Sequence, residues 1–200
     1  MAIIVEHDKR KHTILDKALD VFVDEGYEDA TFQKIADRCG ITRTTLYLYF
    51  RNKREIFISS IRQLTTNIEL SLLDVMHDNK LTSDEKLKQV LHQILDACRE
   101  NPKLFTVILN YLLQVQKTGK NPGTMVRRRI VRLRHLLCNI LIEGIDKGEL
   151  SITVSDISTT DEMLYAMIES SIFRLAILNQ KDIKEMHAAI DLAIEGIKKK

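Results

Sequence analysis

The chain has 200 residues, of which 44% are hydrophobic and 29% charged, and this composition is typical of a globular protein. With 30 Lys and Arg residues against 28 Asp and Glu residues, the net charge is +2, which excludes a histone-like or polybasic protein. Three cysteines without a CxxC spacing argue against a disulfide scaffold. Without a signal-peptide run or an apolar stretch of about 18 residues, we expect a cytoplasmic protein with no contact to a membrane.

Helical periodicity dominates the chain. Apolar residues recur at spacings of three and four, and only two prolines and seven glycines interrupt them, which predicts an all-α fold. The first three helices are predicted over 8–25, 32–39 and 43–49, with Thr31 and Thr42 as N-caps of the second and third. Six further helices are predicted over 52–76, 82–99, 102–117, 124–146, 158–178 and from 182 to the C-terminal lysines.

The helix boundaries are predicted from local signals. Gly26, Gly40 and Gly148 stand where a helix ends, and residues 118–123 form the clearest loop. Four pairs spaced three residues apart are expected to act as capping boxes: Asn52 with Glu55, Thr82 with Glu85, Ser158 with Asp161, and Asp182 with Glu185. We expect an N-terminal three-helix domain over 1–54 and a six-helix domain over 55–200, joined within a helix and not by a flexible linker.

Local charge is uneven. Residues 31–54 carry six basic side chains against the single carboxylate of Asp37, a net charge of +5. Such a face on a small helical unit would attract the phosphates of nucleic acid, although the alternative is an ordinary solvated surface.

A helix-turn-helix is predicted over 31–49. Ile35 and Ala36 would pack inward from its first helix, Ile41 and Leu46 would fix the turn and the second helix, and Gly40 would let the chain reverse. The second helix would expose hydrogen-bonding side chains of a size that enters the major groove: Arg43, Thr44, Thr45, Tyr47 and Tyr49.

Residues 10–60 resemble the DNA-binding domain of the tetracycline-repressor (TetR) family. The matching positions are Ile14, Ala18, Phe22, Gly26-Tyr27, Ala30-Thr31, Ile35-Ala36, Gly40-Ile41, Thr45 to Tyr47, Tyr49-Phe50, Asn52-Lys53 and Leu64. The run from Leu46 to Lys53 is specific to this family among helix-turn-helix proteins. The resemblance is at the level of motifs for about 55 residues and of architecture for the rest, so it does not identify a ligand.

The resemblance implies roles in DNA binding at matched positions. Gln33 and Arg43 would read base edges, and Thr44 and Tyr47 would lie close to bases or sugars. The residues placed at phosphates are Thr31, Thr45, Tyr49 and Lys53, and Thr42 completes the DNA-binding set at the start of the second helix. Thr44 differs from the small residue or proline that is usual at this position, so the resemblance does not identify the bases that are read. The alternative for Tyr47 is plain packing.

The resemblance also implies a regulatory core in the C-terminal domain and a four-helix dimer interface. We expect a mostly apolar effector pocket between the sixth and seventh helices, with Phe105, Leu109, Tyr111, Leu112, His135 and Cys138 as candidate lining. The candidate dimer residues on the last two helices are Leu164, Ile168, Ile172, Leu175, Met186, Ile190 and Ile194. Alternatively, these faces are buried within one chain, and the polar pocket residues are ordinary surface groups.

An arginine run on the seventh helix has three alternative explanations. Its members are Arg127, Arg128, Arg129, Arg132 and Arg134. They could form a solvated face that pairs with the acidic last helices, a site for an anionic ligand, or a patch for a partner protein.

The sequence therefore predicts a dimeric transcriptional regulator, most simply a repressor, that binds palindromic double-stranded DNA and is released by a small-molecule effector. The alternative is a DNA-binding family member that answers to a protein partner or to no ligand. An enzyme is not expected, because no catalytic motif, metal-ligand pattern or cofactor-binding loop is present.

Overall fold

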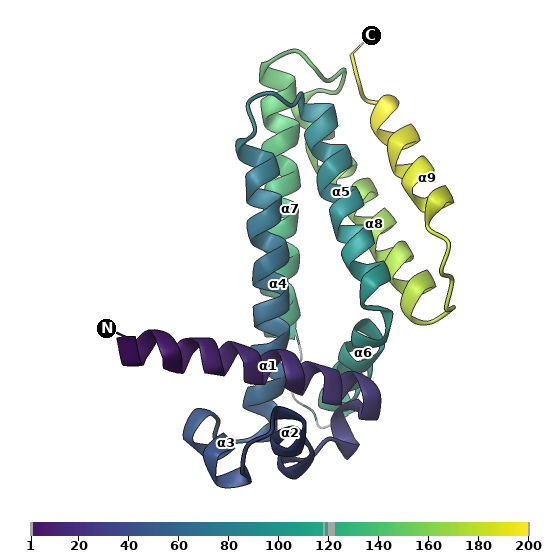
Figure 1. The fold of residues 1–200 in the computed structure, drawn as a ribbon. Coiled ribbons are helices and arrows are strands. Elements are labelled where there is room, and N and C mark those ends of the chain that lie inside the picture. Colours follow the sequence, from purple (N-terminus) through teal and green to yellow (C-terminus); the bar gives the residue numbers. More distant parts are fainter. Residues whose placement is uncertain (1, 118, 120–122, 200) are drawn as a thin grey trace. The chain divides into compact units, whose positions relative to one another are not determined.

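The computed structural model describes residues 2–117, 119 and 123–199, and the side chains of residues 6–117, 119 and 131–199. The helices in chain order are α1 (Ala2–Asp29), α2 (Phe32–Cys39), α3 (Arg43–Tyr49), α4 (Lys53–His77), α5 (Ser83–Glu100), α6 (Pro102–Lys117), α7 (Gly123–Asp146), the 3₁₀ turn η1 (Val154–Asp156), α8 (Ile157–Ala176) and α9 (Lys184–Glu195) (Figure 1). The all-α prediction is confirmed. Across the described ranges, no helix combines the length and apolar character needed to cross a bilayer.

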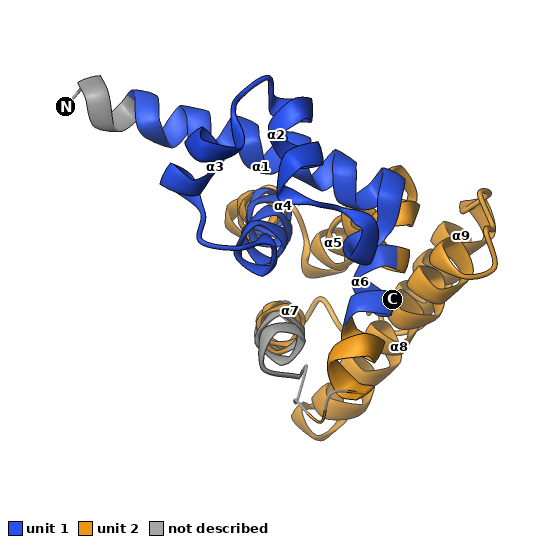
Figure 2. Ribbon diagram, turned by 90° about the horizontal axis from the view of Figure 1, so that it is seen from below, with its two compact units in different colours: residues 1–69, 107–111 blue, residues 70–106, 112–200 orange. Residues whose placement is uncertain are grey.

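The chain forms two compact units, coloured separately in Figure 2. Unit 1 contains Met1–Glu69 and Val107–Tyr111, and unit 2 contains Leu70–Thr106 and Leu112–Lys200. Helices α4 and α6 thus contribute residues to both units. The boundary expected at residue 54 separates a DNA-binding domain from a regulatory domain, and this functional division stays a prediction.

Unit 1 has a core of aliphatic and aromatic side chains. Phe22, Ile35, Leu46 and Phe57 are fully buried, because the apolar stripes of α1 to α4 face one another. The hydroxyl of Ser60 on α4 donates to the carbonyl of Leu15 on α1 at 2.9 Å, which fixes these two helices against each other. The short helices α2 and α3 are therefore held on a rigid base.

The ends of α1 differ from the prediction. The helix begins at Ala2 rather than at Asp8, so it is six residues longer at its N-terminal end. At Gly26 the backbone kinks, with φ 82° and ψ 166°, which only glycine adopts easily, and helical turns resume as far as Asp29. The predicted break at Gly26 is thus present, although the helix is not ended by it.

Unit 2 packs α5 against α7, α8 and α9, and side chains such as Leu87, Leu137 and Leu164 form its core. The side chain of Lys86 is only 1% exposed, and its Nζ lies 2.9 Å from Glu143 Oε1. Helix α7 ends at a left-handed Gly148, as predicted, with the amide of Glu149 donating to the carbonyl of Gly144 at 2.8 Å.

The predicted cap of α8 is wrong. The capping box is formed by Thr153 and Asp156 around η1, and α8 begins at Ile157. Asp161 is instead a buried partner of Arg134, with Oδ2 2.6 Å from the Arg134 Nε. The carboxylate that the local pattern assigns to a cap instead forms an ion pair with Arg134 of α7. The predicted loop at 118–123 lies mostly outside the described residues.

Candidate nucleic-acid interface

The turn between α2 and α3 has the geometry that its sequence predicts. The amide of Lys34 donates to Thr31 Oγ1 at 3.2 Å and starts α2, and the amide of Thr45 donates to Thr42 Oγ1 at 3.1 Å and starts α3. Gly40 lies in the left-handed region with φ 69°, and the amide of Ile41 donates to the carbonyl of Ala36 at 3.0 Å. Both helices are therefore short, capped and set at a fixed turn.

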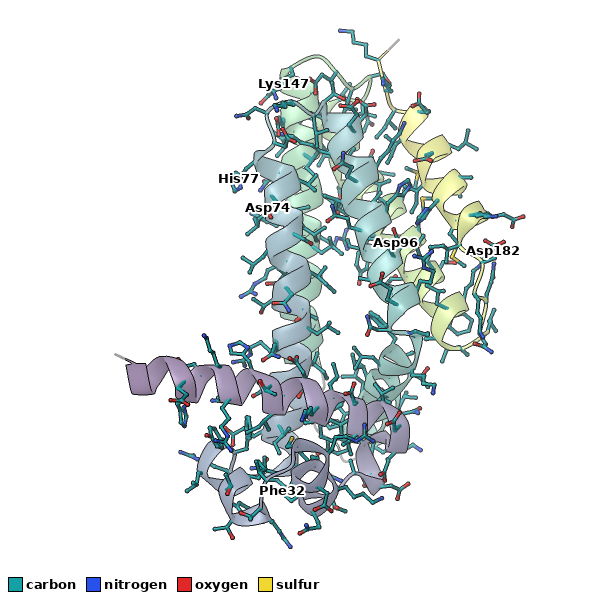
Figure 3. All side chains as sticks on the ribbon, viewed as in Figure 1. Phe32, Asp74, His77, Asp96, Lys147 and Asp182 are labelled. Atoms are coloured by element: carbon teal, nitrogen blue, oxygen red, sulfur yellow. The ribbon has the colours of Figure 1, made fainter. Side chains whose placement is uncertain are left out.

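The exposed side of α3 carries a connected group of side chains. Tyr47 is 49% exposed, and its ring stacks on that of Phe32 with centroids 4.6 Å apart (Phe32 is labelled in Figure 3). The Arg43 guanidinium donates from NH2 to the Tyr47 hydroxyl at 3.2 Å and lies 5.7 Å from the ring centroid. Tyr47 is thus both packed and exposed, and its hydroxyl accepts the hydrogen bond that fixes the Arg43 guanidinium.

The other predicted base-reading residues lie on the same two helices. Thr44 is exposed on α3, and Gln33 is exposed in the first turn of α2. The Gln33 amide donates to Asp37 Oδ1 at 2.8 Å, so its side chain runs along α2. These groups are accessible to a ligand.

The residues predicted to hold phosphates, together with Thr42 from the DNA-binding set, are engaged within the unit. Thr31 and Thr42 act as caps, and Thr45 shares its hydroxyl with Thr42 at 2.8 Å. The Lys53 ammonium donates to the carbonyl of Glu28 at 2.8 Å and lies over the Tyr27 ring. The Tyr49 ring stacks on His7, with centroids 4.7 Å apart.

The positive charge of the α2–α3 region is partly compensated by α1. Lys34 pairs with Glu25, and Arg38 pairs with Asp24 at 3.0 Å. Sequence counting places these acidic groups in an earlier segment, but folding brings them to α2. Because these two basic side chains of α2 are paired, the unit's attraction for phosphates depends mainly on the basic side chains of α3 and of the start of α4.

Unit 1 contains an aromatic cluster that no local sequence pattern predicts. The rings of Tyr27, Phe57 and Tyr111 lie with centroids 4.7 to 4.8 Å apart. The Arg54 Nε donates to the Tyr111 hydroxyl at 3.1 Å. Burial, followed by the nearby Tyr111, raises the pKa of Tyr27, so the Tyr27 phenol stays protonated at neutral pH. Tyr111 comes from α6, and no local signal connects it with α1.

Tyr111 therefore belongs to the aromatic cluster of unit 1, whereas the polar pocket candidates His135 and Cys138 belong to unit 2. Leu109 is also in unit 1 and is half-buried. In unit 2, Phe105, Leu112 and Cys138 are half-buried, whereas His135 is exposed.

Unit 2 contains a small apolar gap between α5, α8 and α9, whose empty space of about 190 Å³ includes open solvent and has no room for a water molecule. It is lined by Leu91, Leu95, Cys98, Ile168, Ser171, Ile172 and Ile190. Burial raises the pKa of Cys98 to about 12, so its side chain is a neutral thiol. The gap is therefore an uncharged space, and the six predicted pocket residues do not line it.

The predicted dimer residues are already covered by other side chains of the same chain. Leu164, Ile168, Leu175, Met186, Ile190 and Ile194 are buried, and Ile172 is half-buried. The exposed apolar side chains of these two helices lie at other positions, namely Met163, Phe173 and Leu192, with Ile177 and Leu178 just after α8.

The arginine run is partly described. The side chains of Arg127, Arg128 and Arg129 lie outside the described residues. Arg134 pairs with Asp161 and with Glu162 on α8, and its guanidinium lies 5.6 Å from the ring centroid of Tyr165. For this arginine, the pairing with α8 that the first alternative expects is present. In the part of the chain whose side chains are placed, no group of three or more His, Cys, Asp or Glu residues is arranged to hold a metal ion.

Comparison with known proteins connects this geometry to a family. The family described as "Bacterial regulatory proteins, tetR family" matches residues 14–59. The uncharacterized HTH-type transcriptional regulator TtgW of Pseudomonas putida is 33% identical over 128 residues, which are 64% of this chain and 87% of that protein. The fatty acid metabolism regulator protein of Bacillus subtilis is 26% identical over 190 residues, covering 94% of this chain and 95% of that one.

A solved structure extends the match over nearly the whole fold. The transcriptional regulator FadR from Bacillus subtilis, in complex with stearoyl-CoA, superposes with a TM-score of 0.70 at 25% identity and covers 92% of this chain and 95% of its own. The family match covers the helix-turn-helix, and the relatives cover the remaining helices. This chain belongs to the tetR family of bacterial regulatory proteins, which are DNA-binding transcriptional regulators and not enzymes.

Proposed function

We propose that the protein is a homodimeric repressor that binds a palindromic operator and is released by a small-molecule effector. The observation that carries the DNA-binding part is the exposed side of α3, where Tyr47, stacked on Phe32, holds Arg43. An arginine in this position can bind a guanine through two hydrogen bonds. A rigid, capped turn holds the helix in one orientation, which reduces the entropy lost on binding.

The proposed DNA surface contains the nine predicted residues. Arg43, Thr44 and Gln33 are assigned to base edges, and Tyr47 to bases or sugars. The phosphate set is Thr31, Thr42, Thr45, Tyr49 and Lys53. The hydroxyls that cap α2 and α3 keep free acceptor or donor capacity after capping, so they can also hydrogen-bond a phosphate oxygen.

A second copy of the chain is the proposed partner of α8 and α9. Palindromic half-sites require a two-fold axis, and the exposed apolar side chains of these helices are concentrated at Met163, Phe173 and Leu192. The interface would use this exposed face, because the residues predicted from the sequence are already covered within unit 2.

The proposed effector class is a fatty acyl thioester. FadR from Bacillus subtilis was solved with stearoyl-CoA, and the fatty acid metabolism regulator is similar over almost the full length. The apolar lining of the gap between α5, α8 and α9 suits a hydrocarbon chain. Because α4 and α6 both contribute residues to the two units, they are the proposed route by which binding in unit 2 changes unit 1.

A family member without a small-molecule ligand is the second candidate. The observation that favours it is that the gap has no room for even a water molecule, whereas usual ligand pockets enclose roughly 300–1,000 Å³. An acyl chain would therefore have to part α5, α8 and α9 further.

The test begins with selection of bound fragments from sheared genomic DNA of the source organism at two salt concentrations. A salt-resistant palindrome, with half-sites about 34–36 Å apart, supports the proposed operator. Fluorescence anisotropy with that site is then repeated with stearoyl-CoA, with free coenzyme A as control. Release by the thioester alone supports the effector class, and DNA binding that no thioester alters favours the second candidate.

A further inference from the structure

Two histidines and two aspartates form a reciprocal arrangement between α5 and α9, which we name the His–Asp clasp. His92 and Asp96 are one turn apart on α5, and His187 and Asp191 are one turn apart on α9. The two imidazole rings stack with centroids 4.2 Å apart and an interplanar angle of 15°. The His92 Nε2 lies 3.1 Å from Asp191 Oδ1, and the His187 Nε2 lies 3.7 Å from Asp96 Oδ1 (Asp96 is labelled in Figure 3).

Each imidazole therefore faces a carboxylate of the opposite helix as well as the other imidazole. The side chains of His92 and His187 are 28% and 27% exposed, but the Nε2 atoms that face the carboxylates are buried. Neither Nε2 has a hydrogen-bond partner of good geometry. The neutral clasp is therefore held by stacking and by the apolar contacts around it.

The other charged groups near the clasp come from the same two helices. Arg99 on α5 places NH2 3.2 Å from Asp96 Oδ1, so Asp96 is shared between Arg99 and His187. On the next turns, Lys88 of α5 pairs with Glu195 of α9 at 2.5 Å. Where α8 meets α5 and α9, it contributes Ile168, Ser171 and Ile172, and α5 adds the neutral Cys98 thiol. The balance of charge is thus set by two carboxylates, one arginine and the two imidazoles.

Protonation of both rings is opposed by this arrangement. Desolvation, then His92, lowers the pKa of His187, and Arg99 acts in the same direction, while Asp96 and Asp191 only partly compensate. One imidazolium can be neutralised by the facing carboxylates, but a second would place two like charges 4.2 Å apart. The doubly protonated pair is accommodated more easily when α9 moves away from α5.

We propose that the His–Asp clasp is an acid-sensitive latch that holds α9 on α5 at neutral pH and releases it as the pH falls below about 6.5. Because the pKa of His187 is lower in the folded chain than in free imidazole, the released state binds the proton more readily. Docking of α9 is therefore complete above the ordinary histidine pKa and is lost as the pH decreases toward the lowered value. For each proton taken up, the docking constant falls by up to about tenfold per pH unit in this range.

Release of α9 would also alter the proposed dimer, since α9 carries the exposed Leu192. This consequence rests on the proposed function, whereas the latch itself does not. Acid would then weaken operator binding through the oligomeric state, without any change at Arg43.

Hydrogen exchange on the full chain without DNA tests the latch. After correction for the intrinsic pH dependence of exchange, the opening constant of the α9 amides should rise about tenfold or more between pH 7.5 and 5.5. The variants His187→Gln and His92→Gln should each reduce this rise, because glutamine keeps a polar side chain but does not titrate. His77→Gln, at an exposed histidine on α4 (labelled in Figure 3), should leave it unchanged.

A second measurement does not depend on the folding of the variants. The imidazole proton resonances of the wild-type chain, followed by NMR through the same pH range, should show His187 titrating below the ordinary histidine pKa of about 6.5. A corrected α9 opening constant that is independent of pH, or a His187 that titrates at or above the ordinary histidine pKa of about 6.5, would overturn the latch. Because neither measurement contains DNA, failure of the repressor proposal cannot imitate either result.

Discussion

Tyr47 combines a packing contact with an exposed surface that the proposed function uses for recognition. Its ring lies on Phe32, and its hydroxyl accepts a hydrogen bond from Arg43, yet about half of it is exposed. The sequence leaves packing and DNA contact as alternatives for this residue, and the geometry allows both at once. A platform of this kind limits the rotamers of Arg43 before DNA arrives, which favours base reading over simple charge attraction.

Removal of Arg43 should therefore reduce the preference for the operator over unrelated DNA, whereas loss of a positive charge alone would weaken binding to both equally. We expect Arg43→Ala to weaken binding to the selected operator by roughly 1–3 kcal/mol and to bring it close to binding of unrelated DNA. Tyr47→Phe keeps the stack on Phe32 but removes the acceptor, so it should lose a smaller part of the same preference. Anisotropy titrations with operator and scrambled duplexes measure both effects, and an equal loss on the two duplexes would contradict the assignment of Arg43 to bases.

Lys53 is the matched contrast, because its assigned role is a phosphate contact. Its alanine variant should weaken operator and scrambled DNA alike and lower the salt dependence of binding. The structure adds a second consequence, since the Lys53 ammonium also holds the carbonyl of Glu28. Lys53→Ala should therefore lower the melting temperature, whereas Arg43→Ala should not. A salt slope unchanged by Lys53→Ala would exclude the phosphate contact.

The buried pair of Lys86 and Glu143 predicts an asymmetry between two substitutions. Glu143→Gln would leave the ammonium of Lys86, which is 1% exposed, without a counter-charge, and we expect a loss of about 3 kcal/mol or more in the free energy of unfolding. Lys86→Met replaces the buried charge by an apolar chain of similar length and should change that free energy by no more than about 1 kcal/mol. Urea denaturation at pH 7 measures both, and equal losses would contradict a dominant desolvation penalty for Lys86.

The same pair has a defined pH dependence. Hydrogen bonds from Lys147 and Lys86 lower the pKa of Glu143 in the folded chain. The stabilisation is therefore complete above the ordinary glutamate pKa of about 4.3 and is lost as the pH falls through the lowered folded value. In the Glu143→Gln variant, this acid-side loss should be smaller in urea denaturation repeated at lower pH.

At the scale of the helices, the boundaries were predictable where a cap is local. Helices α2, α3 and α6 have the bounds predicted from Thr31, Gly40, Thr42 and Pro102, because each signal acts on backbone groups within a few residues. The box at Ser158 and Asp161 was wrong because Asp161 forms a tertiary ion pair with Arg134. A sequence pattern cannot show that a distant guanidinium competes for the same carboxylate.

Gly144 illustrates a helix requirement that the sequence does not reveal. It lies inside α7, where alanine would ordinarily be favoured, but a Cβ there would lie 2.6 Å from two carbons of Leu150 and 2.8 Å from the Cβ of Ser83. We therefore expect Gly144→Ala to destabilise the chain by about 1–3 kcal/mol despite its better helix propensity. The measurement is the urea midpoint, and an unchanged or higher midpoint would show that Leu150 moves without cost.

At the scale of the whole molecule, the fold class follows from periodicity, but the partner of each helix face does not. The apolar stripes of α8 and α9 were correctly located as buried faces, yet Leu164, Ile190 and Ile194 pack within the chain. A 3.6-residue period records that a face is covered, not whether the covering surface belongs to the same chain. Tyr111 in the aromatic cluster follows the same rule, because its ring contacts come from residues more than fifty positions away.

The exposed face of α8 and α9 gives the prediction for assembly. Phe173 is 53% exposed and Leu192 is 75% exposed, and neither is needed to fill the core of unit 2. If a second copy covers these side chains, the double variant Phe173→Glu and Leu192→Glu should be monomeric. Formation of the dimer would otherwise bury two added carboxylates from each chain in an apolar interface. Light scattering after gel filtration measures the mass of the particle, and anisotropy measures operator affinity.

The variant should keep its helical circular dichroism and its binding to an isolated half-site, since α3 and its turn are unchanged. Affinity for the full palindrome should fall by at least about tenfold, because two linked half-sites bind with a higher effective concentration than one. Ile142→Glu is the matched control, with a similarly exposed side chain, at 45%, on α7. If the double variant stays dimeric, the two-fold interface lies elsewhere on the chain, and if the control also dissociates, the effect reflects added charge and not the α8–α9 face.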